Sequence, residues 1–196
     1  MFLNKTKFKK LLKEAYSGGG LKAGEVYGGL VLSGSAWASW TRSGDVPNWL
    51  KGAVMEIVGE LPEEGEIFMA SRNDGIQYEI KNNEMLDLPS VFRNSHCTLT
   101  DTKITEASKG LRFFQIDQSK KAIAAHEYFS AMIDLRELQG ENAPMGPVSQ
   151  DEKAYFLLYK NEQSAFGFYR ISTSDDQTCN VMNALETLDF AELRKR

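Results

Sequence analysis

The chain has 196 residues, of which 42% are hydrophobic and 26% charged, and its formal net charge is −4. This composition is typical of a globular protein that buries a core, as one domain or as two small ones. No apolar run approaches the ~20 residues that span a bilayer, so we expect a cytoplasmic protein with no membrane partner. Cys97 and Cys179 lie far apart without a CxxC motif, which predicts free thiols.

A basic amphipathic helix is predicted at the front of the chain. In NKTKFKKLLKEAYSGGG, residues 4–20, apolar side chains recur at the spacing of one helical face, with Asn4 as the N-cap. The opposite arc is predicted to carry the lysines Lys5, Lys7, Lys9, Lys10 and Lys13. Five lysines and one glutamate give residues 4–16 a charge of +4, and the rest of the chain therefore carries −8. The lysines form either a solvated face or a surface for DNA phosphates or an acidic protein partner.

Strand and helix patterns alternate in the first half. EVYGGLVLSGSAWASWTR, residues 25–42, predicts two strands joined at Gly34 and Ser35. A second helix is expected from Pro47 to near Pro62, and EIFMAS and IQYEI then form a hairpin across RNDG. Residues 82–110 are expected to hold a loop, one strand and another loop, with the junction between two halves among them.

The second half repeats this order of elements. LRFFQI predicts a strand, and HEYFSAMIDLREL, residues 126–138, predicts a helix with Phe129, Met132 and Ile133 inward. KAYFLLYK and AFGFYRI predict a hairpin, and Asp176 or Thr178 is expected to cap a last helix. Both halves, 1–95 and 96–196, thus run helix, hairpin, helix. We predict an α+β protein of two similar halves, with a mainly antiparallel sheet covered by helices, as two domains or one continuous domain.

The sequence offers few groups for catalysis or metal binding. The glycines of SGGGLKAGEVYGG follow a helix instead of opening one, which favours a helix stop over a phosphate loop. Adjacent His96 and Cys97 point apart in an extended chain, and His126 beside Glu127 is ordinary at a helix start. The glutamates of residues 60–66 are expected to form a solvated bend. We therefore predict no catalytic residue, metal or cofactor, and favour a non-enzyme.

The strands of the second half are apolar on both faces. A homo-oligomer interface through this sheet is predicted at Tyr155, Tyr159, Phe166, Phe168 and Tyr169. The alternative is that helices or a second sheet of the same chain cover both faces. Trp37 and Trp40 likewise point to opposite sides of a regular strand, so one of them needs a cover or a partner.

Two long segments pass from a helix to paired strands. They are VPNWLKGAVMEIVGELPEEGEIFMASRNDGIQYEI, residues 46–80, and the second-half segments HEYFSAMIDLREL and GPVSQDEKAYFLLYKNEQSAFGFYRI. In element order they resemble the building unit of DNA sliding clamps. The resemblance implies helices that line a ring and lysines that face DNA phosphates.

These observations favour a binding or assembly protein, with a DNA-associated accessory factor of bacterial or phage type as the most concrete hypothesis. The alternative is a small-molecule enzyme or ligand-binding protein, with its site beside Trp37 or Trp40, Trp49 and the glutamate turn. A continuous basic face would favour the first hypothesis. A pocket that encloses an aromatic ring and two or more carboxylates would favour the second.

If the lysines of the first helix contact phosphates, duplex DNA binds with an affinity that falls steeply with salt, because each contact releases condensed counterions. Fluorescence anisotropy should then show that Lys9→Glu combined with Lys13→Glu abolishes binding. Absence of any binding at low salt would exclude the DNA hypothesis.

Overall fold

The computed structural model describes residues 1–79, 87–134, 136, 137, 140 and 142–193. Its helices are α1 (Lys5–Gly18), η1 (Ser43–Asp45), α2 (Asn48–Val58), α3 (Leu88–Arg93), α4 (Glu127–Ser130), α5 (Asp176–Glu186) and α6 (Phe190–Leu193). Its strands are β1 (Leu21–Val26), β2 (Gly29–Ser33), β3 (Trp37–Arg42), β4 (Ile67–Ser71), β5 (Gly75–Glu79), β6 (Cys97–Glu106), β7 (Leu111–Ile116), β8 (Ala122–His126), β9 (Met145–Ser149), β10 (Phe156–Lys160) and β11 (Ser164–Tyr169).

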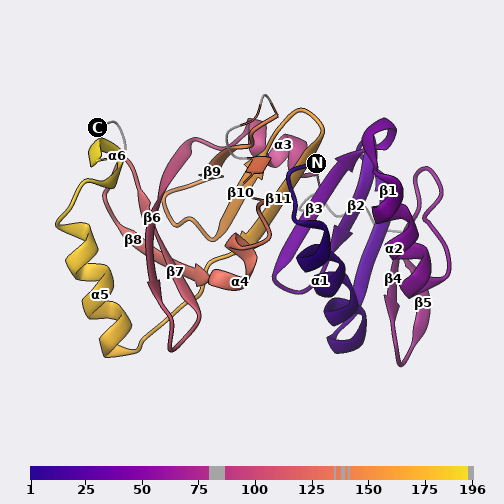
Figure 1. Cartoon of the computed structure of the whole chain (residues 1–196), viewed down its shortest axis with the longest axis horizontal. Coiled ribbons are helices and arrows are strands. Elements are labelled where there is room, and N and C mark those ends of the chain that lie inside the picture. The colour runs from indigo at the N-terminus through magenta and orange to yellow at the C-terminus, as the bar shows by residue number, and fades with distance from the viewer. Residues whose placement is uncertain (80–86, 135, 138–139, 141, 194–196) are drawn as a thin grey trace.

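All of these strands belong to one antiparallel sheet in the order β5-β4-β1-β2-β3-β11-β10-β9-β6-β7-β8. The strands of the first half occupy one end and those of the second half the other (Figure 1). They meet where β3 pairs with β11, with Trp37 opposite Phe168. The predicted α+β class with a mainly antiparallel sheet is confirmed, and the sheet runs unbroken from one half to the other.

The second half of the sheet curls back on itself. Ile171, just after β11, forms an antiparallel bridge with Ala124 of β8, the last strand in the order, and its N–H donates to the Ala124 carbonyl at 2.8 Å. The six strands from β11 to β8 therefore enclose part of the core. The first half is an open sheet with α1 and α2 side by side on it (Figure 1). This difference leaves the predicted similarity of the halves unconfirmed.

Helices cover both faces of the sheet. The apolar sides of α1 and α2 pack with Trp37 in the main core, whereas α3 packs on the opposite face with Trp40. Both tryptophans are buried, and the Trp40 indole N–H donates to the Tyr27 carbonyl at 3.2 Å. The opposite orientation expected of these two residues is therefore confirmed, and the chain itself supplies the cover.

The N-terminal segment shortens the helix that periodicity predicts over residues 126–138. The Asn4 N–H donates to the Met132 carbonyl at 2.7 Å, and the Asp134 N–H donates to the Phe2 carbonyl at 2.8 Å. These bonds take backbone groups that a continuing helix would need, so α4 ends at Ser130. Its predicted inward residues are nevertheless buried: Phe129, Met132 and Ile133. Positions 135, 138 and 139 of that prediction lie outside the described residues.

Several other elements differ from the sequence prediction. The hairpin predicted at Gly34 and Ser35 is confirmed as β2 and β3, but a further strand, β1, precedes it, because the chain also turns at Tyr27 and Gly28, both with positive φ. The alanine-rich β8 and the Gly-Pro-containing β9 were not predicted, because neither has the β-branched or aromatic alternation of a strand. The N-cap of α5 is Asp175, whose carboxylate accepts from the Thr178 N–H at 2.8 Å. In the described part of the chain, no helix has the length and apolar character to cross a membrane.

Substitution of Gly167 by alanine tests the close packing of β11 against β10. A Cβ at Gly167 would lie 2.3 Å from the Phe156 ring and 2.9 Å from the Leu157 carbonyl oxygen. We expect Gly167→Ala to lower the free energy of unfolding by about 1–3 kcal/mol in urea denaturation, because ring and backbone must both shift.

Gly44→Ala is the matched control, since its added methyl would meet nothing within 4 Å. We expect a change within about 0.5 kcal/mol there. Equal stability of the two variants would contradict this packing.

Candidate ligand-binding pocket

The structure divides the five lysines of α1 among different surroundings. Lys9 is half-buried, and the other four are exposed. The Lys13 ammonium lies 3.0 Å from a carboxylate oxygen of Glu56 on α2, and this hydrogen bond lowers the Glu56 pKa. Lys10 lies 3.6 Å from Glu14. Two of the lysines predicted to contact phosphates thus already face carboxylates of the chain, and the DNA contact stays a prediction.

Three of the five aromatic residues predicted at an oligomer interface are buried inside the chain. They are Tyr159, Phe166 and Phe168. Phe166 packs edge-on against Phe8 of α1, and Phe168 stacks on Phe129 of α4 at 5.8 Å. Tyr155 and Tyr169 are 51% and 39% exposed, so they alone of the five offer side-chain surface to a second copy. The homo-oligomer stays a prediction.

The carboxylates of the predicted glutamate turn interact locally. Glu66 accepts from the Glu63 N–H at 2.9 Å, and Glu60 accepts from the Tyr78 hydroxyl at 2.7 Å. That hydrogen bond raises the Tyr78 pKa to about 12. Trp49 lies elsewhere, edge-on to Phe8 of α1. No group of three or more His, Cys, Asp or Glu side chains within the described ranges is placed to hold a metal ion.

A pocket of about 560 Å³ opens instead in the second half, at a bulge in the β6–β7 pairing. We call it the bulge pocket. Its walls come from residues 100–103 of β6, Arg112 of β7, α4 with the turn after it, and the chain entering β9. Lys7 of α1 adds one side, and Phe190 and Leu193 of α6 add another.

The bulge is built by the short segment Asp101–Thr102–Lys103. The register of β6 with β7 shifts between Asp101 and Thr105, and Lys103 has a φ of 64°. The Asp101 carboxylate accepts from the Lys103 N–H at 2.9 Å, which stabilises this turn. The Thr102 hydroxyl donates to the Phe113 carbonyl at 2.8 Å and accepts from the Ile104 N–H at 3.2 Å. These bonds satisfy backbone groups that the interrupted ladder leaves unpaired.

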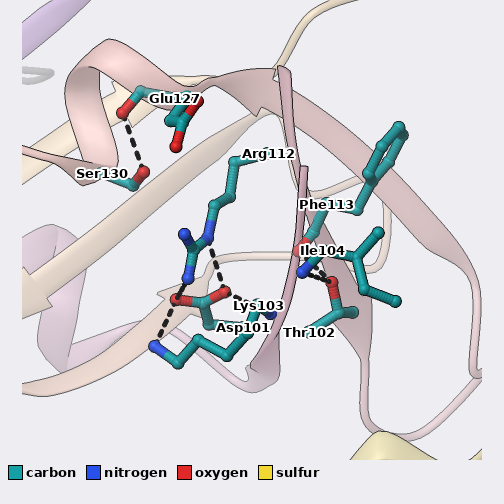
Figure 2. A network of polar contacts seen from close by, with 8 residues as sticks. All are labelled: Asp101, Thr102, Lys103, Ile104, Arg112, Phe113, Glu127 and Ser130. Atoms are coloured by element: carbon teal, nitrogen blue, oxygen red, sulfur yellow. Dashed lines mark hydrogen bonds and ion pairs between the residues drawn. The ribbon is translucent and has the colours of Figure 1, made fainter. Parts of the chain in front are cut away.

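Asp101 and Arg112 form a two-pronged ion pair on the pocket wall (Figure 2). Arg112 Nε lies 2.9 Å from Asp101 Oδ1, and Nη2 lies 3.0 Å from Oδ2. Both side chains are less than a fifth exposed, and Lys103 Nζ adds a third contact at 2.7 Å. Burial alone would raise the Asp101 pKa, but the hydrogen bonds from Arg112 and Lys103 outweigh it and hold the pKa below its usual value.

Glu127 faces the other side of the same guanidinium. Figure 2 shows its carboxylate pointing toward the part of Arg112 that Asp101 does not contact. Among the described residues no cation pairs with this carboxylate within 4.0 Å. The Ser130 hydroxyl donates to the Glu127 backbone carbonyl at 2.9 Å, and the Glu127 N–H donates to the Gly110 carbonyl at 2.8 Å. The backbone position of Glu127 is therefore fixed while its carboxylate remains available.

A buried glutamine attaches the α6 wall. Gln115 of β7 is 1% exposed, and its amide donates to the carbonyls of Leu185 and Leu188 at 3.2 and 3.0 Å. Its oxygen accepts from the Phe190 N–H at 2.9 Å. One side chain thus holds the end of α5 and the start of α6 against the sheet, which places Phe190 and Leu193 at the pocket.

The pocket combines opposite charges with apolar surface. Lys7, Lys103 and Arg112 are its cations, and Asp101 and Glu127 are its carboxylates. Its apolar lining is Ile133, Pro144, Pro147, Phe190 and Leu193, and Tyr159 is its aromatic residue. Of these residues, the sequence had singled out Lys7, Glu127, Ile133 and Tyr159, each for another reason. None of the tryptophans or of the glutamates of residues 60–66, where the sequence predicted a ligand site, lines the bulge pocket.

No protein-family model matches this chain, and comparisons with curated proteins and with solved structures find no significant match. The resemblance to DNA sliding clamps is therefore neither supported nor excluded by any relative.

The Asp101 pairing predicts a defined pH dependence of stability. Because folding lowers its pKa, the ionised carboxylate stabilises the fold fully above an unfolded-state pKa of about 3.9, and this contribution is lost as pH falls through the folded pKa. We expect Asp101→Asn to lower the free energy of unfolding near pH 7 by about 1–3 kcal/mol. In urea denaturation, the difference in free energy of unfolding between Asp101→Asn and the unmodified protein should be constant from pH 7 to 5 and should become smaller below pH 4.

Asp176→Asn, at the exposed start of α5, controls for the loss of one negative charge. A gap for Asp101→Asn that stays constant or widens below pH 4 would contradict the assigned pairing.

Proposed function

We propose that the protein is a non-catalytic binding protein that holds a small molecule in the bulge pocket. The observation that carries this proposal is the meeting of charged and apolar side chains from distant parts of the chain around one 560 Å³ hollow. Ligand pockets of proteins have volumes of roughly 300–1,000 Å³, with mostly apolar walls and a few placed polar groups. The bulge pocket agrees with that description in size, and it is more polar than most, since half of its lining residues are polar or charged.

The charges also distinguish this pocket from ordinary surface. The Asp101–Arg112 pair is mostly buried, although a buried pair is weak evidence of a stabilising role, because desolvation offsets its attraction. The pair leaves hydrogen-bond donors of Arg112 directed away from Asp101, and Glu127 faces them without an ion pair. A ligand that binds these Arg112 donors and the Glu127 carboxylate would account for charged groups that the bulge itself does not use.

A DNA-associated role is the second candidate, favoured by the exposure of Lys5, Lys7, Lys10 and Lys13 on α1. The chain's own carboxylates beside Lys10 and Lys13 compete with phosphates for those two side chains. This second candidate also includes a homo-oligomer that forms through Tyr155 and Tyr169, and a cytoplasmic location. Ligand binding in the pocket is the better supported of the two functions, because Tyr159, Asp101 and Glu127 line the same hollow.

Thermal-shift screening of a library of small acids, amines and zwitterions tests the ligand-binding function. A compound that binds the folded state alone stabilises it by about 2.7 kcal/mol at one hundred times its dissociation constant, so a binder raises the melting temperature by several degrees. The shift should disappear in Ala131→Phe, whose ring would occupy the hollow that Ala131 lines.

Gly44→Ala is the control, because Gly44 does not line the pocket. The absence of any stabilising compound at millimolar concentration would contradict the proposal, as would shifts that survive in a folded Ala131→Phe variant.

A further inference from the structure

We propose that the ligand of the bulge pocket is a small zwitterion with an apolar body, of the chemistry of an α-amino acid. Its carboxylate pairs with Arg112 and Lys7, and its ammonium pairs with Glu127. This inference rests on the ligand-binding function proposed above and specifies the chemistry of that ligand.

The donors for a ligand carboxylate lie on one side of the Arg112 guanidinium. A guanidinium has five N–H donors in a fixed fork, and Asp101 accepts from Nε and Nη2. The remaining donors include both N–H groups of Nη1, on the side that Figure 2 shows facing Glu127. Lys7 is an exposed residue that lines the same pocket and has no ion pair within 4.0 Å among the described residues. The hydrogen bonds from Arg136, together with the charge of Lys7, lower the pKa of Asp134. Because Asp101 holds the guanidinium from behind, the free edge is oriented before a ligand arrives.

The acceptor for a ligand ammonium is Glu127. Its backbone is fixed by Gly110 and Ser130, and its carboxylate is directed toward the pocket wall at Arg112. An organic acid alone would place a second negative charge beside Glu127. An amine alone would place a positive charge beside Arg112 and Lys7. A molecule with both groups on one carbon meets each partner with the opposite charge.

The rest of the pocket suits an apolar body. Its apolar lining residues are Ile133, Pro144, Pro147, Phe190 and Leu193. The lining cations exceed the lining carboxylates by one, since Lys7, Lys103 and Arg112 face Asp101 and Glu127. A dianion such as phosphate would overcompensate this small excess and meet Glu127 directly.

Isothermal titration calorimetry of the full chain with three matched compounds tests the inference. Phenylalanine carries both charged groups, 3-phenylpropanoate only the carboxylate, and 2-phenylethylamine only the ammonium. We expect phenylalanine to bind at least tenfold more tightly than either. Leucine, 4-methylpentanoate and 3-methylbutylamine form a second series that tests an aliphatic body in the same way.

Variants separate the two charged contacts. Glu127→Gln should lower the affinity for phenylalanine at least tenfold and leave that for 3-phenylpropanoate equal or higher, because only the ammonium loses its partner. Lys7→Gln should weaken phenylalanine and 3-phenylpropanoate but not 2-phenylethylamine. Lys13→Gln is the matched control on the same helix, since Lys13 pairs with Glu56 away from the pocket.

Equal affinity of the acid and the amino acid, or of the amine and the amino acid, would overturn the zwitterion assignment, and so would no binding in either series. Inorganic phosphate that binds more tightly than all six compounds would also overturn it. The proposed function has a separate test. It is contradicted when no compound of the wider library raises the melting temperature, or when the shifts persist in a folded Ala131→Phe variant.

Discussion

The ion pair between Asp101 and Arg112 is the constraint on which the pocket depends. The carboxylate accepts two bonds from the guanidinium and one from the Lys103 N–H, so a single side chain closes the bulge and orients Arg112. The strand ladder is interrupted there, and residues 100–103 beside the interruption line the pocket. A guanidinium held on one edge by a protein carboxylate presents its other donors at a fixed angle, which suits a bidentate anion better than a flexible ammonium would.

The pocket also depends on the packing of the two halves. Residues 2–4 form hydrogen bonds with residues 132–134, which places the start of α1, and with it Lys7, beside the end of α4. The pairing of β3 with β11 makes both halves parts of one sheet, and Phe8 packs against Trp37 of the first half and Phe166 of the second. Gln115 fixes α6 on the opposite side. Contacts far apart in the sequence therefore position each wall.

Periodicity and turn chemistry were enough to predict the elements held by local rules. The helix at residues 48–58, the hairpin across RNDG and the β10–β11 hairpin were predicted because their apolar spacing and turn residues agree. The predicted helix was wrong in length at α4, because backbone hydrogen bonds to residues 2–4 replace helical ones. The strand β8 was missed, because its alanines do not show the side-chain alternation typical of a strand. The pocket could not be predicted, because no residue pattern around Asp101 and Arg112 reveals the register shift between Asp101 and Thr105. Glu127 was noted only as an ordinary first-turn glutamate, since sequence alone cannot place it opposite Arg112.

Mapping of backbone amide shifts by ¹⁵N NMR during titration with phenylalanine tests the central claim most directly, because it locates a ligand without a variant. The account predicts the largest changes at Thr102, Lys103, Arg112 and at Ser130 and Ala131, which surround the pocket from separate strands and turns. Changes confined to the surface around Tyr155 and Tyr169, or spread along the outer face of α1 without the bulge, would contradict it.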